Sequence, residues 1–185
     1  MKRSSLLIAA TTMMIGCGEP PSPPANQDLI IGTASEDAST FVPVEDGERL
    51  TLLPGAQGGF HVFVRVRLGR DYVEQLGSEW ILKREARRAD TSELVSRAEQ
   101  RVTTTGNGLR MVPTDEDPDV FETNRTMLLF LCPTPVGIGI RDQMLRLEVT
   151  ASSDGNGPGP QGTLLFQPEC PESDQRVFCE SICSG

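Results

Sequence analysis

The stretch of sequence that decides the fold is residues 60–68, which read Phe-His-Val-Phe-Val-Arg-Val-Arg-Leu. Every second residue, from Phe60 to Leu68, is apolar, and His61, Phe63, Arg65 and Arg67 lie between them. Because successive side chains of a strand point to opposite faces, this period of two predicts a β-strand with one face in the core. His61 falls on the opposite face, where we expect a structural or surface role.

Further strands are predicted on both sides of this one. Residues 49–53 lead through a Pro-Gly-Ala-Gln-Gly-Gly turn (54–59) into the 60–68 strand, so the two segments are expected to be neighbours. Residues 126–132 are almost continuously apolar, which is typical of a strand buried on both faces. The other predicted strands are residues 80–87, 109–112, 143–150 and 162–167.

Residues 94–102 fit two patterns. Asp90 and Glu93 have the spacing of a helix cap, and a helix would place Leu94, Val95, Ala98 and Val102 on one side. The same segment also alternates as a strand, and the threonines at 103–105 favour β structure. We therefore favour a strand.

The composition supports an all-β domain. The chain has 185 residues, 5% aromatic residues, 18 glycines and 14 prolines, and its apolar segments are short and separated by turn signals. Seven or eight such strands predict an antiparallel immunoglobulin-like β-sandwich over residues 34–185, although the Cys-Trp-Cys signature of immunoglobulin domains is missing.

The N-terminus has the layout of a secretory signal. Lys2 and Arg3 precede an apolar stretch from Leu6 to Ile15. That stretch is too short for a transmembrane helix, which needs about 20 apolar residues. We expect residues 1–16 to direct export and then to be removed.

Met14-Ile15-Gly16-Cys17 resembles the lipobox of bacterial lipoproteins. The resemblance implies cleavage after Gly16 and attachment of fatty acyl chains such as palmitate to Cys17; the alternative is an ordinary secretory signal with an incidental cysteine. Residues 17–33, rich in proline at their start, are predicted to be a tether. By resemblance to lipoprotein sorting, Gly18 in place of Asp favours the outer membrane.

The charge of the chain argues against nucleic acid as a partner. There are 17 basic and 26 acidic residues, and removal of the signal takes away only Lys2 and Arg3, which leaves a net charge of about −11. Nucleic-acid binding requires concentrated positive charge. The one basic cluster, residues 84–88, is interrupted by an acid and is expected to be a solvated strand face.

Four cysteines remain besides Cys17, and an even number in an exported protein predicts two disulfides. They are Cys132, Cys170, Cys179 and Cys183. Strand order suggests that Cys132 pairs with one of the other three, and a Cys179–Cys183 bridge is disfavoured because its loop is tight. The sequence leaves the pairing open. Zinc is the rival explanation, but the spacings match no zinc finger or ribbon.

The residues offer little for catalysis. His61 is the single histidine, which excludes sites that need two or more, and no Gly-x-Ser-x-Gly elbow occurs. Asp115, Asp117 and Asp119 lie in an acidic loop that makes them weak calcium candidates, but the loop departs from EF-hand spacing. We expect no enzyme, no cofactor and a solvated loop.

Residues 53–62, Leu-Pro-Gly-Ala-Gln-Gly-Gly-Phe-His-Val, resemble a segment of a group of small bacterial lipoproteins, together with the lipobox before it and the cysteine-bearing tail after it. The resemblance implies a lipoprotein with a β-sandwich and implies no activity. The sequence thus predicts an envelope protein, lipid-anchored outside the cytoplasm, whose non-catalytic domain serves as an interaction or structural module. Its partners would be the membrane and an envelope protein or polysaccharide; the alternative is a calcium- or carbohydrate-binding surface domain.

Overall fold

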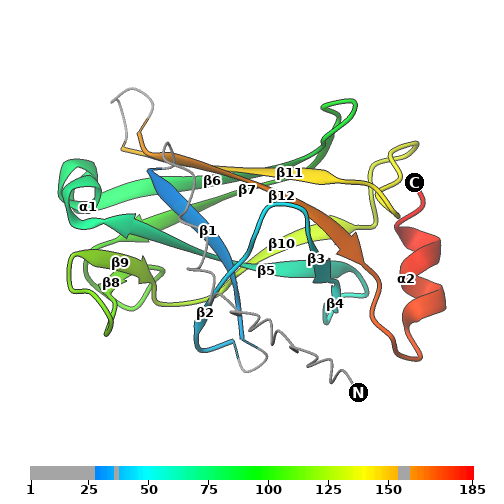
Figure 1. Ribbon diagram of the computed structural model, residues 1–185, viewed down its shortest axis with the longest axis horizontal. Helices are drawn as coiled ribbons and strands as arrows, with labels where there is room; N and C mark the ends of the chain where they lie inside the picture. Colours follow the sequence, from blue (N-terminus) through cyan, green and yellow to red (C-terminus); the bar gives the residue numbers. More distant parts are fainter. Residues whose placement is uncertain (1–27, 36–37, 154–158) are drawn as a thin grey trace, which may run out of the picture.

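The computed structural model describes residues 28–35, 38–153 and 159–185, and within them the chain forms two β-sheets that pack face to face (Figure 1). The first sheet has the order β2 (Phe41–Pro43), β1 (Leu29–Ala34), β5 (Phe60–Gly69), β9 (Val120–Thr123), β8 (Met111–Pro113), with β4 (Leu53–Pro54) and β10 (Met127–Cys132) also paired to β5. The second has the order β3 (Glu48–Thr51), β12 (Gln161–Glu169), β11 (Leu145–Ser152), β6 (Glu79–Arg88), β7 (Leu94–Thr103). The predicted all-β sandwich is confirmed.

β5 is the centre of the first sheet. Its apolar residues point into the sandwich, where Val64 and Val66 are 1% and 0% exposed. β1 and β4 share one edge of β5, and β9 and β10 share the other, all antiparallel to it. Residues 49–53 were predicted to lie beside β5, and only Leu53, in β4, does so. Residues 49–51 belong to β3, which pairs with β12 of the other sheet.

The described residues form twelve strands rather than seven or eight. Several of the additional strands contain only two to four residues, too few for an alternating pattern to be visible in the sequence. The pairing of β3 with β12 is parallel, whereas all the other strand pairs are antiparallel.

The boundary predicted between tether and domain was wrong. β1 lies almost wholly within residues 17–33, yet Leu29 is 0% exposed and pairs with Leu68 of β5. The proline-rich composition ends before this strand, and the apolar triplet Leu29-Ile30-Ile31 begins it. The sandwich therefore includes residues 29–33, which were assigned to the tether.

β10 is not buried on both faces as predicted. Leu129 and Leu131 are in the core, but Leu128 and Phe130 are 41% and 48% exposed. A continuous apolar run cannot distinguish a fully buried strand from one that presents aromatic and aliphatic side chains to a partly covered face. Phe130 packs there beside His61, with ring centroids 5.4 Å apart.

The strand interpretation of residues 94–102 is confirmed, since β7 pairs antiparallel with β6 along its length. Two helices were not predicted. α1 (Arg70–Leu76) follows β5 directly, and α2 (Arg176–Ile182) lies in the cysteine-bearing tail. Figure 1 shows them at opposite ends of the sandwich, with α2 close to the C-terminus.

The two sheets meet closely where β1 of the first passes β12 of the second. A Cβ atom built on Gly162 would overlap the carbonyl oxygen of Leu29, which belongs to rigid backbone. Glycine in a strand often marks such a close approach of another backbone. The sandwich needs glycine here for space, not for an unusual backbone angle.

Gly162→Ala is therefore expected to lower the free energy of unfolding by about 1–3 kcal/mol, because β1 and β12 must separate to admit the methyl group. Urea unfolding followed by circular dichroism measures the change. Gly108→Ala is the matched control, since a Cβ there meets no heavy atom within 4 Å. Equal stabilities of the two variants would contradict the close-approach explanation.

Candidate functional site

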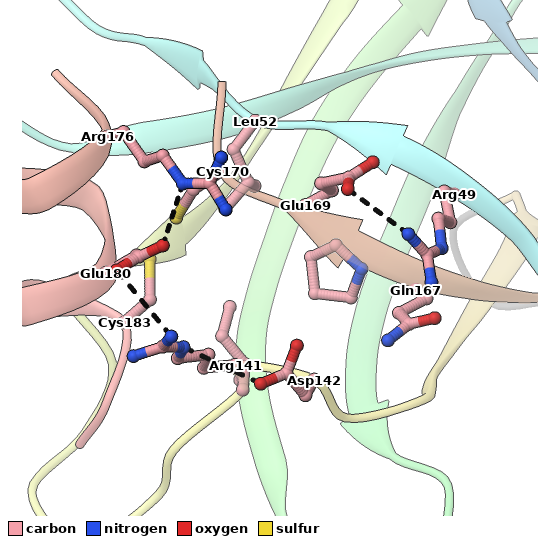
Figure 2. Close-up of a pocket in the computed structure, with 12 residues that line it drawn as sticks. Arg49, Leu52, Arg141, Asp142, Gln167, Glu169, Cys170, Arg176, Glu180 and Cys183 are labelled. Atoms are coloured by element: carbon pink, nitrogen blue, oxygen red, sulfur yellow. Dashed lines mark hydrogen bonds and ion pairs between the residues drawn. The ribbon is translucent and has the colours of Figure 1, made fainter. Parts of the chain in front are cut away.

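A polar cavity lies at the end of the sandwich that carries α2. A cavity of about 100 Å³ opens between the end of β12, α2 and the loop before β11 (Figure 2). Its charged lining residues are Arg49, Arg141, Asp142, Glu169, Arg176 and Glu180. Leu52, Ile140, Cys170 and Cys183 supply apolar and sulfur surface beside them.

Ion pairs neutralise the charges of this cavity. Figure 2 shows Glu180 between two guanidinium groups, with Arg176 at 3.0 Å and Arg141 at 3.6 Å. The hydrogen bond from Arg176, aided by the charge of Arg141, lowers the pKa of the Glu180 carboxyl. Arg49 pairs with Glu169 at 3.3 Å on the other side. The three cations are balanced by acids, so the cavity as it stands has no net charge to attract an ionic ligand.

Sequence reasoning did not find these charged residues. Arg176 and Glu180 have the i,i+4 spacing of a helical ion pair, which was the one available signal, but it depended on predicting α2. Arg49 and Arg141 come from distant parts of the chain, and only tertiary packing brings them to the same cavity.

Two disulfides join α2 to the sandwich. Cys132–Cys183 links the end of β10 to the end of α2, and Cys170–Cys179 links the residue after β12 to the middle of α2. The Cα atoms lie 5.2 Å and 5.8 Å apart, within the usual range for a disulfide. The expectation that Cys132 bonds to one of the last three cysteines is confirmed, and the structure selects Cys183.

The two disulfides also touch each other. The Sγ atoms of Cys179 and Cys183 lie 3.8 Å apart, and those of Cys170, Cys179 and Cys183 all lie within 4.8 Å of one another. In the described part of the chain, this is the one group of three or more cysteine, histidine or acidic residues gathered closely enough to hold a metal ion. Metals bind thiolates, and these sulfurs are committed to disulfides.

The weak calcium candidates are not brought together. The side chain of Asp117 accepts a hydrogen bond from the backbone N–H of Asp119, as in a turn, and the Asp119 carboxylate pairs with Arg70 at 2.8 Å. Asp115 belongs to no close group of ligands among residues 28–35, 38–153 and 159–185. The loop thus uses two of these three acids for its own fold and for contact with α1.

His61 has a structural position away from the cavity. Its side chain is 6% exposed and packs between Phe63 and Phe130, with the turn at Gly55 close to its Nδ1 atom. Burial lowers the pKa of His61, which favours the neutral form of the ring.

The basic cluster at residues 84–88 is only partly the solvated face that was predicted. Arg84 points between the sheets, is 3% exposed and donates a hydrogen bond to the carbonyl oxygen of Leu128 on β10. Burial lowers the pKa of Arg84 to about 10, so it stays charged at neutral pH. The alternating pattern of β6 puts Arg84 on the same face as the buried Trp80 and Leu82. A charged side chain is rarely buried, so the sequence pointed to a solvated position.

Glu85 lies on the outer face of β6 at the centre of three cations. Its carboxylate contacts Lys83 at 2.9 Å, Arg87 at 3.2 Å and Arg97 of β7 at 2.5 Å. The hydrogen bond from Lys83 is the largest of the effects that lower the pKa of Glu85 to about 2, and those from Arg87 and Arg97 add to it. This cluster stabilises the pairing of the edge strand β7.

The free energy of unfolding is expected to fall by about 1–2 kcal/mol as Glu85 becomes protonated, less than the full pKa shift implies because Lys83 and Arg97 are partly solvated. Since the pKa is lowered by folding, the stabilisation is complete above pH 4.5 and is lost as the pH falls toward 2. Urea titrations between pH 6 and pH 2.5 measure it. Glu85→Gln should remove this pH-dependent component, whereas Glu99→Gln, at an exposed position on β7, should behave as wild type.

No protein-family model, no curated protein and no solved structure matches this chain. Neither of the two described helices has the length and apolar character required to span a bilayer. Cys17 and the signal predicted for residues 1–16 lie outside the described residues.

Proposed function

We propose that this protein is a lipid-anchored lipoprotein of the bacterial envelope, whose β-sandwich is a non-catalytic interaction or structural module outside the cytoplasm. The observation that carries the proposal is the use of the cysteines. Both disulfides together occupy Cys132, Cys170, Cys179 and Cys183, so Cys17, which follows the apolar stretch, is left for another role.

Two structural disulfides favour an oxidising compartment, because thiols are kept reduced in the cytoplasm. Lys2, Arg3 and the apolar stretch before Cys17 supply a signal for reaching such a compartment. By resemblance to lipoprotein sorting, Gly18 after Cys17 favours the outer membrane. The oxidising compartment is thus inferred from the C-terminal cysteines, and export is inferred from the N-terminal residues.

The position of β1 suggests how the domain is presented. Leu29 pairs with Leu68, directly before α1, and the Tyr72 hydroxyl of α1 donates a hydrogen bond to the Asp28 carboxylate. The chain therefore enters the sandwich at the α1 end, and α2 lies at the other end (Figure 1). In an anchored molecule, the attachment point would thus be at the end of the sandwich opposite α2, which leaves the α2 end available to an envelope partner.

A non-catalytic role is supported by the arrangement of the polar groups. The charged residues of the α2 cavity are paired with one another, and the single histidine is packed between phenylalanines elsewhere. Such paired charges hold the tail in place and are not poised for proton transfer.

Intact mass spectrometry of the protein purified from membranes tests the proposal. We expect a chain that begins at Cys17, carries the mass of two or three acyl chains and is lighter by four hydrogens because of its two disulfides. A chain that retains residues 1–16, or one with an unmodified Cys17 thiol, would overturn the lipoprotein assignment.

A further inference from the structure

We propose that the sulfurs of Cys170, Cys179 and Cys183 form a thiol–disulfide exchange site, through which a protein dithiol that reduces the Cys170–Cys179 bridge also opens Cys132–Cys183. The juxtaposition that carries this inference is the contact of two separate disulfides on one short helix, with Sγ atoms of Cys179 and Cys183 3.8 Å apart. The inference does not depend on lipidation of Cys17.

Cys170 is the point of entry. It is half-buried and lines the α2 cavity, whereas Cys132, Cys179 and Cys183 are 2%, 0% and 1% exposed. An external thiolate therefore reaches the Cys170 sulfur first. The thiolate is the species that attacks and leaves in disulfide exchange, and the cavity gives an external thiol its route to the Cys170 sulfur.

The first step forms a bond between the external sulfur and Cys170 and breaks the Cys170–Cys179 bond, which leaves Cys179 as a thiolate. This thiolate is buried, and Cys183 lies within its reach. Attack on Cys183 forms a Cys179–Cys183 bond and expels Cys132 as a thiolate, which takes up a proton. The sulfurs must approach from 3.8 Å to about 2 Å, which requires rotation of the cysteine side chains at the end of α2.

The second thiol of the external dithiol then releases Cys170. Overall, the dithiol is oxidised to its disulfide, one protein disulfide is reduced, and the protein holds free thiols at Cys132 and Cys170 with a new bridge inside the tail. The Cys179–Cys183 bridge was disfavoured from the sequence as tight, and in a fully oxidised protein it is not formed. The Cys179–Cys183 bridge forms only after the external dithiol has donated two electrons to the protein.

The consequence is release of α2. In the oxidised protein, one bridge ties α2 to β10 and the other ties it to β12. After exchange, neither covalent tie remains, although a single disulfide has been reduced. α2 is then held by weaker contacts such as Phe178 against Phe60 and Arg141 with Glu180. One reduction event thereby removes both disulfide ties of the tail, whose Cys183 carbonyl oxygen accepts a hydrogen bond from the Ile140 N–H.

The test is partial reduction of the full-length protein, purified with both disulfides intact, with substoichiometric dithiothreitol. Free thiols are trapped by acid quench and alkylation, then mapped by peptide mass spectrometry. In molecules that have lost one disulfide, we expect labels on Cys132 and Cys170 and a Cys179–Cys183 linkage. Labels on Cys170 and Cys179, labels on Cys132 and Cys183, or the absence of any species with two free thiols would overturn the proposal.

The double variant Cys170→Ala/Cys179→Ala removes the entry bridge and keeps Cys132–Cys183. We expect dithiothreitol to open the remaining bridge about tenfold more slowly than it exposes Cys132 in the wild type, because both of its sulfurs are buried. An equal rate would show that Cys132–Cys183 is reduced directly. Mapping of the wild type decides the question even if the variant folds poorly.

Discussion

Cys17→Ser is expected to abolish acylation and to move the protein from the detergent phase to the aqueous phase in Triton X-114 partitioning. Each buried methylene of an acyl chain contributes about 0.8 kcal/mol, and a single chain binds a membrane only marginally, so stable attachment needs the two or three chains that a lipoprotein carries. Serine offers no thiol for the thioether. Incorporation of labelled fatty acid, followed with the partitioning, measures the loss.

Ser22→Ala, in the proline-rich stretch after Cys17, is the control and should retain both label and detergent partitioning. The apolar stretch from Leu6 to Ile15 is too short to replace the acyl chains as a membrane span. Full retention of the serine variant in the detergent phase, without label, would show that something other than lipid on Cys17 holds the protein at the membrane.

The second large effect concerns the Cys132–Cys183 bridge, whose removal by Cys132→Ala/Cys183→Ala is expected to lower the free energy of unfolding by about 4 kcal/mol. In the chain-entropy model, a disulfide restricts the unfolded chain more strongly when its loop is longer. This bridge closes a separation of 51 residues, whereas Cys170–Cys179 closes 9. Guanidinium unfolding without reductant measures the change.

The matched comparison is Cys170→Ala/Cys179→Ala, which removes the other bridge and is expected to cost about 2.5 kcal/mol by the same relation. Both variants keep α2 tied to the sandwich by one disulfide, to β12 in the first and to β10 in the second. A larger loss for the shorter loop would show that native packing around α2, and not loop entropy, dominates.

The sequence predicts well those segments whose local pattern agrees with their final place. β11 alternates strictly between buried and half-buried residues, every second residue of β5 from Phe60 to Leu68 is apolar, and both strands have their apolar face in the core. β7 was correctly assigned despite a competing helix pattern, because its alternation continues into β-favouring threonines. Each of these strands is long enough for its periodicity to be visible.

Errors arose where the local pattern carried no information about the neighbours. The exposure of Phe130 depends on how far the turn at Gly55 covers the face beside it, and the burial of Arg84 depends on a carbonyl group of the opposite sheet. α1 and α2, with seven residues each, are too short to show an amphipathic period. The α2 cavity was missed for the same reason, because its cations Arg49, Arg141 and Arg176 come from three separate segments of the chain.

By itself, the sequence determined that the chain is a β-sandwich, that its last four cysteines are oxidised and that Cys132 bonds within the C-terminal group. These follow from short-range alternation and from cysteine number, which a chain carries before it folds. Only the tertiary structure decided which sulfur Cys132 joins, that the two disulfides touch, and that β1 belongs to the core. Those properties depend on distances between segments far apart in the chain, and such distances are fixed when the two sheets pack together and bring the ends of β10, β12 and α2 to one place.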